Sequence, residues 1–133
     1  MMFNDTCTVY NKYIENKIEK WQLTVLKGVF WEGARGSNFR KTGLENADSV
    51  FILIPHKVKA DKQFLPPQEF LKAEDKFSYW TLQPGDTIIK GDISYEVIKS
   101  SKELEQFDEC YKLTKVDSKL FGSSMAHWEC GAK

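Results

Sequence analysis

The sequence predicts a mainly β protein, a small antiparallel β-barrel or sandwich with one short helix and long loops. Six or so short apolar segments, several of which alternate with polar residues, are separated by clusters that are typical of turns. Aromatic residues make up 14% of the chain, a high share that suits strands and interfaces. At 133 residues, we expect a single barrel-like domain over 1–133, long enough to bury a core.

The first two strands are expected near the beginning of the chain. Residues 6–14 are rich in β-branched and aromatic side chains, which pack well on a pleated surface, and a polar turn follows over 15–19. A helix over 10–21 is the alternative, because four apolar residues of that stretch also recur at helical spacing. Residues 21–31 alternate as a long strand, and Gly28 is a natural position for a β-bulge.

The middle of the chain combines an exposed loop, a buried strand and a short helix. Residues 32–43 hold three glycines, three basic residues and little apolar content, which predicts a long exposed loop. Residues 49–55 predict a buried strand that ends at Pro55, because proline cannot donate a hydrogen bond to a ladder. A helix of two or three turns is expected within 66–76, which begins with prolines and continues with Glu69.

A hairpin is the most distinct local pattern of the second half. Residues 84–86, Pro-Gly-Asp, are typical of a turn that precedes a strand. Residues 91–92, Gly-Asp, are typical of a two-residue hairpin link, and the apolar residues that follow at 93, 95 and 97 alternate as a returning strand would.

The remaining segments complete the predicted barrel. The acidic stretch 102–109 is either a connecting loop or a short helix, and 109–116 alternates as one more strand. Residues 118–133 are either a C-terminal tail or the final strand, because glycines stand near both ends of this stretch.

Composition argues against several classes of function. Nineteen basic and nineteen acidic residues cancel, so we expect no domain-wide positive field to hold nucleic acid or an anionic membrane. No apolar run approaches the roughly 20 residues of a membrane span. The first ten residues lack the charged and apolar regions of a secretion signal. We therefore expect a chain kept in a cytoplasm, without a membrane partner or a sequence-specific nucleic-acid partner.

Candidate catalytic and metal-binding residues are few, and we expect neither an enzyme nor a cofactor. Three widely spaced cysteines fit reduced thiols better than a disulfide framework, and one histidine with one cysteine cannot fill a tetrahedral zinc site. His127 and Cys130 could form a thiol dyad, but nothing in the sequence orients the imidazole. Asp86 and Asp92 are explained by turns, and Glu96 by a solvent-facing strand position.

Three cations and one tryptophan are the candidate partner-binding residues. Arg35, Arg40 and Lys41 lie in the glycine-rich loop, which lacks the spacing of a phosphate-binding loop and has no helix pattern after it. They are a solvated loop face, or they reach a protein partner, since arginine is enriched at interfaces. Trp128 has little apolar company in its segment. It is either a core residue or an anchor on a mobile tail that enters a partner's pocket.

Four stretches carry a resemblance to a known group of proteins: TVYNKYIENKIEKW…TVLKGVFWEG, ADSVFILIP, YWTLQPGDTIIKGDISYEV and MAHWECGAK. Together they resemble a family of small proteins encoded in phages and prophages of Firmicutes, and they span nearly the whole chain. Genes of that family are commonly found among the capsid and head-tail connector genes. The pattern PGDxIxxGxxxYEV is similar to that of phage head-closure (stopper) proteins, which are small β-barrels.

The resemblance implies a structural virion protein at the head-tail junction, a head-closure or connector subunit that acts through protein-protein contacts in a homo-oligomeric ring. The implied partners are the portal, adaptor and tail-completion proteins, with DNA nearby if the ring encloses a channel. The implied location is the virion, and the host cytoplasm during assembly. The chain departs from typical stoppers by its length and its helix within 66–76. The alternative is a small phage-encoded protein that binds and regulates a host factor.

Overall fold

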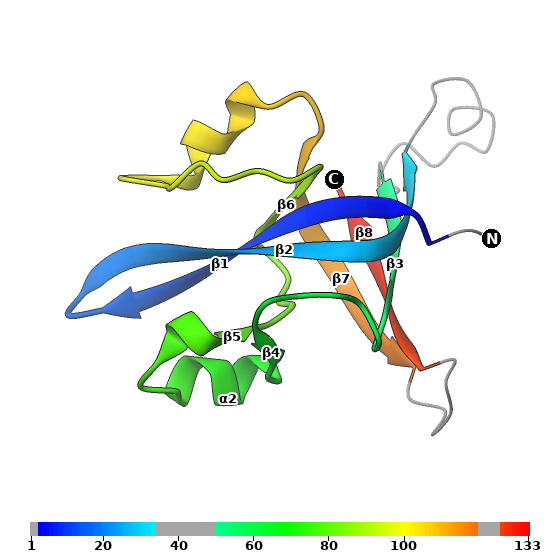
Figure 1. The fold of residues 1–133 in the computed structure, drawn as a ribbon. Helices are drawn as coiled ribbons and strands as arrows, with labels where there is room; N and C mark the ends of the chain where they lie inside the picture. Colours follow the sequence, from blue (N-terminus) through cyan, green and yellow to red (C-terminus); the bar gives the residue numbers. More distant parts are fainter. Residues whose placement is uncertain (1–2, 34–49, 120–125) are drawn as a thin grey trace.

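The protein is a closed antiparallel β-barrel, seen in a computed structural model that describes residues 3–33, 50–119 and 126–133 (Figure 1). Six strands follow one another around the barrel in the order β1-β2-β3-β8-β7-β6. Their bounds are β1 Asp5–Glu15, β2 Ile18–Gly33, β3 Val50–Pro55, β6 Thr87–Lys90, β7 Cys110–Lys119 and β8 His127–Ala132. The expected fold class is thus confirmed, and of its two alternatives the barrel is correct.

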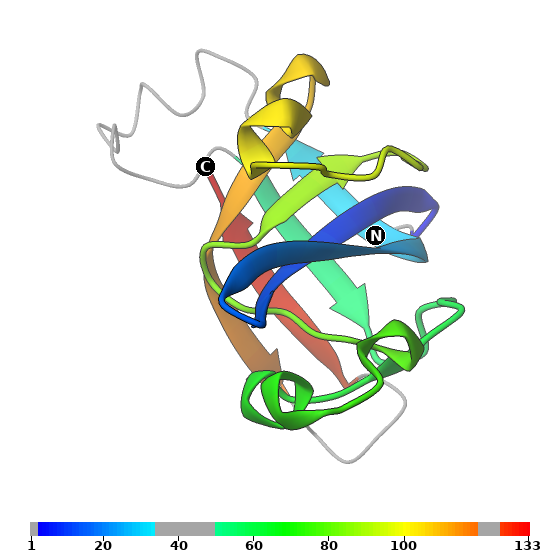
Figure 2. The same cartoon turned by 90° about the vertical axis from the view of Figure 1, so that its left-hand side faces the viewer.

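Two excursions of the chain lie outside the barrel wall. The first contains β4 (Gln63–Phe64), α2 (Pro67–Lys72), the 3₁₀ helix η1 (Lys76–Ser78) and β5 (Tyr79–Trp80), and β4 pairs with β5 in parallel. The second contains the 3₁₀ helix η2 (Ser101–Gln106). Figures 1 and 2 show these two excursions on opposite sides of the β1–β2 hairpin. Within the described residues, no helix has both the length and the apolar character needed to cross a membrane.

The hairpin between β1 and β2 settles the ambiguity of residues 10–21. Asn16 and Lys17 both have positive φ, 54° and 66°, and they join Glu15 directly to its partner Ile18. Such a two-residue turn matches the twist of the flanking strands. The chain is therefore a strand, a turn and a strand, as expected, and the helical alternative is wrong.

A β-bulge at Gly28 bends β2, as the sequence predicted. Asp5 pairs with Val29 while Thr6 pairs with Lys27, so Gly28 has no partner across the ladder. Its φ of +96° is one that residues with a Cβ rarely adopt. Before the bulge β2 pairs with β1, and beyond it residues 30–33 pair with β3. The bulge therefore lets one long strand belong to two parts of the barrel wall.

The interior of the barrel is filled by apolar side chains from alternate positions of the strands. Aromatic side chains from the first excursion and from β8 lie at one end of this interior. The fully buried members of the cluster include Cys7, Val9, Leu26, Val29, Ile52, Ile54, Ile88, Cys130 and Ala132.

The predicted hairpin after residue 90 is wrong. β6 ends at Lys90, and residues 91–100 lie in no strand. The physical reason is that both edges of β6 are already paired, with β1 on one side and β7 on the other, so a returning strand would find no free edge. Instead the Gly91 N–H donates to the Thr6 carbonyl at 2.7 Å, and the chain passes over the barrel wall.

The alternating apolar residues after Gly91 cover the outer face of the barrel. Ile93, Tyr95 and Val97 are half-buried against a second apolar cluster built on Tyr10 and Leu104. The Tyr10 hydroxyl donates to the Tyr95 carbonyl at 2.6 Å. The pattern thus predicted the buried side of this segment correctly, although its backbone joins no ladder. The stretch 102–109 is partly helical, which is the second of its two alternatives.

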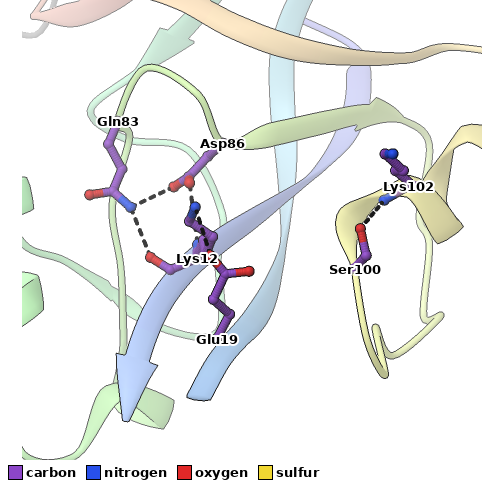
Figure 3. A network of polar contacts seen from close by, with 6 residues as sticks. All are labelled: Lys12, Glu19, Gln83, Asp86, Ser100 and Lys102. Atoms are coloured by element: carbon purple, nitrogen blue, oxygen red, sulfur yellow. Dashed lines mark hydrogen bonds and ion pairs between the residues drawn. The ribbon is translucent and has the colours of Figure 1, made fainter. Parts of the chain in front are cut away.

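Glu103 holds the second excursion in shape. One oxygen of its carboxylate accepts the Tyr95 hydroxyl at 2.9 Å and the Ile98 N–H at 3.0 Å. The other oxygen accepts the N–H groups of Lys99 and Ser100 at 2.6 and 2.9 Å. These donors, the backbone amides first, lower the pKa of Glu103 to about 2. Ser100 in return caps η2 by accepting the Lys102 N–H (Figure 3).

Asp86 fastens the turn before β6 to β1. Figure 3 shows its carboxylate accepting from Gln83, whose amide nitrogen also reaches the Lys12 carbonyl. The Lys12 N–H donates to Asp86 at 3.2 Å and the Asn11 amide donates at 3.0 Å. Burial of the carboxyl group outweighs these donors and raises the pKa of Asp86 above its ordinary value. Asn11 also exchanges two hydrogen bonds with the backbone of Thr81, at 2.8 and 3.1 Å.

We predict that Gly28→Ala lowers the free energy of unfolding by about 1–2 kcal/mol, the cost of left-handed backbone for a residue with a Cβ. The added Cβ would meet its nearest atom at 3.9 Å, so the loss comes from φ and not from a clash. Gly33→Ala is the matched control in the same strand, since its Cβ would make ordinary contacts at 3.7 and 3.8 Å. Urea denaturation measures both, and equal effects would contradict the role given to the bulge.

We predict that Glu103→Gln changes how stability depends on pH. Because the folded-state pKa of Glu103 is about 2, against an ordinary 4.5, its carboxylate stabilises the fold above pH 4.5. That contribution is lost as the pH falls towards 2, so the difference in free energy of unfolding between wild type and Glu103→Gln should shrink over this window. Glu105→Gln, at an exposed position of the same helix, is the control. Parallel profiles for wild type and Glu103→Gln would refute the prediction.

Candidate protein-binding site

The candidate binding residues of the sequence fall in two places. Arg35, Arg40 and Lys41 belong to the expected loop 32–43, and they lie outside the described residues, as does that loop beyond Gly33. Trp128 lies in β8, which is the final strand and not a tail.

Trp128 is a core residue, and the expectation of an exposed anchor is wrong. Only 6% of it is exposed. Its ring stacks on that of His56 with 4.0 Å between centroids, and it packs against Phe64 and Trp80 at 4.4 and 5.7 Å. The sequence signal for burial of Trp128 is its alternation with Cys130 and Ala132, because all three side chains point into the barrel.

The thiol dyad considered from the sequence is not assembled. His127 and Cys130 lie on opposite faces of β8, since strand positions an odd number of residues apart face opposite ways. Burial raises the pKa of the Cys130 thiol to about 12, which disfavours the nucleophilic thiolate. His127 instead places Nε2 at 3.0 Å from the Glu129 carboxylate on the outer face. The three cysteines are free thiols, as expected.

A metal centre is not visible in the described chain. No group of three or more histidine, cysteine, aspartate or glutamate side chains in residues 3–33, 50–119 and 126–133 is arranged to hold an ion.

An open cavity of about 910 Å³ lies on the outer face of β2, β3 and β8. Its apolar lining comes from Phe3, Leu53, Pro55 and Val58. Leu53 and Pro55 line it because their positions in β3 alternate with Ile52 and Ile54, which face the core. The cavity is therefore formed by the back of the barrel wall and by the chain that turns away after Pro55. We call it the lysine cavity, after the cations described next.

Lys27, Lys57 and Lys59 give this cavity a positive rim. Lys27 and Lys59 are joined as an isolated antiparallel bridge, with two backbone hydrogen bonds of 2.9 and 3.0 Å. Residues directly opposite each other in such a pair share a face, and like charges there repel. None of the three ammonium groups has an ion-pair partner among the residues that the structure describes. Glu129 also lines the cavity, but its carboxylate is paired with His127. The rim therefore favours an anionic group.

Sequence reasoning missed the lysine cavity. The signal was the alternation of lysines in Lys57-Val58-Lys59, which begins two residues after the strand-ending Pro55. The sequence could not show that Lys27 belongs to the same site, because it lies 32 positions before Lys59, its partner in the bridge.

A second cavity of about 560 Å³ lies at the end of the barrel beside Trp128. Prolines 66, 67 and 84 line it together with His56 and Phe64. Burial, and the nearby charge of His127, lower the pKa of His56 below its ordinary value, so this ring is largely uncharged at neutral pH. The cavity presents apolar rings and a neutral imidazole, which makes it a weaker candidate for charge-guided recognition than the lysine cavity.

We predict that Trp128→Ala lowers the free energy of unfolding by about 3–5 kcal/mol, the usual loss for a large buried aromatic residue. Trp128→Phe should retain much of the stability and keep the fold measurable. Phe77→Ala is the control, because that side chain is 74% exposed and should change stability little. Thermal denaturation followed by circular dichroism checks all three, and an unchanged midpoint for Trp128→Ala would mean that this residue is not part of the core.

Comparison with known proteins places the chain in a family without supplying a function. Neither a curated protein nor a solved structure matches it. A family described as a family of unknown function (DUF6751) matches residues 2–133, which is nearly the whole chain. The protein therefore belongs to the DUF6751 family.

Proposed function

We propose that the protein is a non-enzymatic structural subunit of a phage particle, located at the head-tail junction, where it acts through protein-protein contacts in a ring. Its partners in this proposal are further copies of itself and the portal, adaptor or tail-completion proteins. The resemblance described above is the source of the location. The fold is compatible with it, because small β-barrels are what that resemblance implies.

The observation that carries the proposal is a closed, filled barrel with exposed apolar groups on the parts that project from it. The barrel interior is packed with side chains. The β1–β2 hairpin extends beyond the barrel wall (Figure 1), and Ile14 and Ile18 beside its turn are 65% and 60% exposed. Leu71 and Phe77 are exposed on the first excursion. Exposed apolar side chains on projecting segments are suited to contacts with other proteins.

The thiols and carboxylates discussed above support a structural role more than a chemical one. The buried cysteines carry raised pKa values, and the carboxylates of Asp86 and Glu103 are engaged in holding backbone segments. The two buried thiols are thus disfavoured as nucleophiles, and the two carboxylates have a role in holding the fold.

The proposal predicts that the protein is required to produce tailed, infectious particles. In a phage or prophage that encodes it, deletion of the gene should leave heads and tails that fail to join, as seen by electron microscopy. A plasmid copy of the wild-type gene should restore infectivity and serves as the control. Normal yields of tailed, infectious particles after deletion would refute the proposal.

Mass spectrometry of purified particles distinguishes this proposal from a role as a regulator of a host factor. A junction subunit should be present in purified virions at several copies per particle. If the protein is abundant in infected cells and absent from the virions, a host-directed role is the better explanation.

A further inference from the structure

We propose that the lysine cavity of one subunit receives an acidic, apolar turn of a second copy of this chain, in a head-to-tail contact. The turn comprises residues 69–77, which are the end of α2, the link to η1 and the start of η1; we call it the acidic turn. This inference rests on the proposed function in one respect, since it names the surfaces through which the ring would form.

Hydrogen bonds and a cation–π contact fix the shape of the acidic turn. The Lys76 ammonium donates to the carbonyls of Leu71 and Ala73 at 3.2 and 2.7 Å. It also lies 5.4 Å from the centre of the Tyr13 ring, which is a cation–π distance. Asp75 accepts the Phe77 N–H at 3.1 Å and so begins η1. These contacts turn the charge of Lys76 inward and leave the outer side of the turn to other residues.

The acidic turn exposes both apolar and anionic groups. Leu71 is 51% exposed and Phe77 is 74% exposed. Three carboxylates, those of Glu69, Glu74 and Asp75, lie in the same short stretch. Glu69 and Glu74 are exposed and have no ion-pair partner within the described part of the chain. Lys72 is the opposing exposed cation.

The lysine cavity has the complementary chemistry. The cavity combines apolar lining residues with lysines, and the acidic turn combines Leu71 and Phe77 with carboxylates. Lys27 and Lys59 repel each other across their bridge, so a carboxylate placed between them would relieve an existing cost as well as add an attraction.

The two surfaces lie in different places on the molecule. Figure 1 shows α2 on one side of the barrel, and β3 with the N-terminal end on the other. When two copies join through two different surfaces, one copy keeps a free lysine cavity and the other keeps a free acidic turn. Further copies can therefore bind at both ends of the pair. Such an assembly closes into a ring when the rotation between neighbours allows it. The self-association of this chain would thus be heterologous, not two-fold.

The test uses two variants of the full-length protein that each lack one surface. Lys57→Glu with Lys59→Glu reverses the charge of the lysine cavity, and Phe77→Asp disrupts the acidic turn. All three side chains are exposed, so the fold should be kept, which circular dichroism verifies. Sedimentation velocity should show concentration-dependent assembly of the wild type that weakens with added salt. Each variant alone should associate at least about 30-fold more weakly, as expected when a contact hot spot is lost.

Mixing the two variants in equal amounts is the decisive step. The intact turn of one variant can still enter the intact cavity of the other, and no second contact is left. The mixture should therefore form dimers and stop there. Matched controls change the same charge or apolar character on the second excursion: Lys99→Glu with Lys102→Glu, and Ile98→Asp at a side chain that is 77% exposed. These controls should assemble like the wild type.

Several outcomes would overturn the inference. The first is a wild type that stays monomeric up to millimolar concentration. The second is a loss of assembly in the control variants that equals the loss in the test variants. The third is a mixture of the two test variants that stays monomeric. None of these outcomes bears on the presence of the protein in virions, which is measured separately. A virion protein whose variant mixture stays monomeric would keep its proposed function and lose only this contact.

Discussion

Closure of the barrel through β1 is the constraint on which the rest of the structure depends. β1 pairs with β2 along one edge and with β6 along the other, so the sheet has no open edge between its first and its later strands. In the described part of the chain, the segments between strands that do not join the ladder therefore lie outside the barrel wall. Both excursions described above, with α2 and η2, follow from this single requirement.

Two carboxylates hold segments outside the ladder in place, and their pKa values move in opposite directions: Asp86 fastens the turn before β6 to β1, and Glu103 fixes the shape of the second excursion. Asp86 is buried, and the cost of removing its charge from water exceeds the benefit of its hydrogen bonds, which raises its pKa. Glu103 accepts four donors close to solvent, and its pKa is lowered. Both segments are therefore held by a carboxylate, but only the more accessible carboxylate, that of Glu103, stabilises the fold as it ionises.

Zero net charge conceals an uneven distribution of charge. Lysines without carboxylate partners gather at one cavity, and carboxylates gather on the turn between α2 and η1. Charges gathered in this way can recognise a surface of opposite sign at short distance, even when the net charge of the molecule is zero. Apolar groups accompany the charges in both places. This combination supports recognition between proteins, and the contact between copies proposed above uses both parts of it.

Short stretches of neighbouring residues were enough to predict much of the secondary structure. The turn after Glu15, the bulge at Gly28 and the short helix that begins with proline could be predicted because backbone preferences of a few neighbouring residues decide them. The alternation of Ile93, Tyr95 and Val97 likewise predicted which side chains are buried.

Tertiary structure alone decided the pairing and the surfaces. Residues 91–100 have the pattern of a strand, but the edge that they would need is occupied by segments distant in the chain. Trp128 is isolated in sequence and yet lies among aromatic rings from three other segments. The bridge from Lys27 to Lys59 similarly exists only once β2 meets the chain after β3. The sequence by itself determined that this is a strand-rich chain that forms an antiparallel barrel or sandwich, because alternation and turn chemistry are local. Which edges are filled, which aromatic residues are covered and which charges face one another depend on long-range contacts, and only the folded barrel sets them.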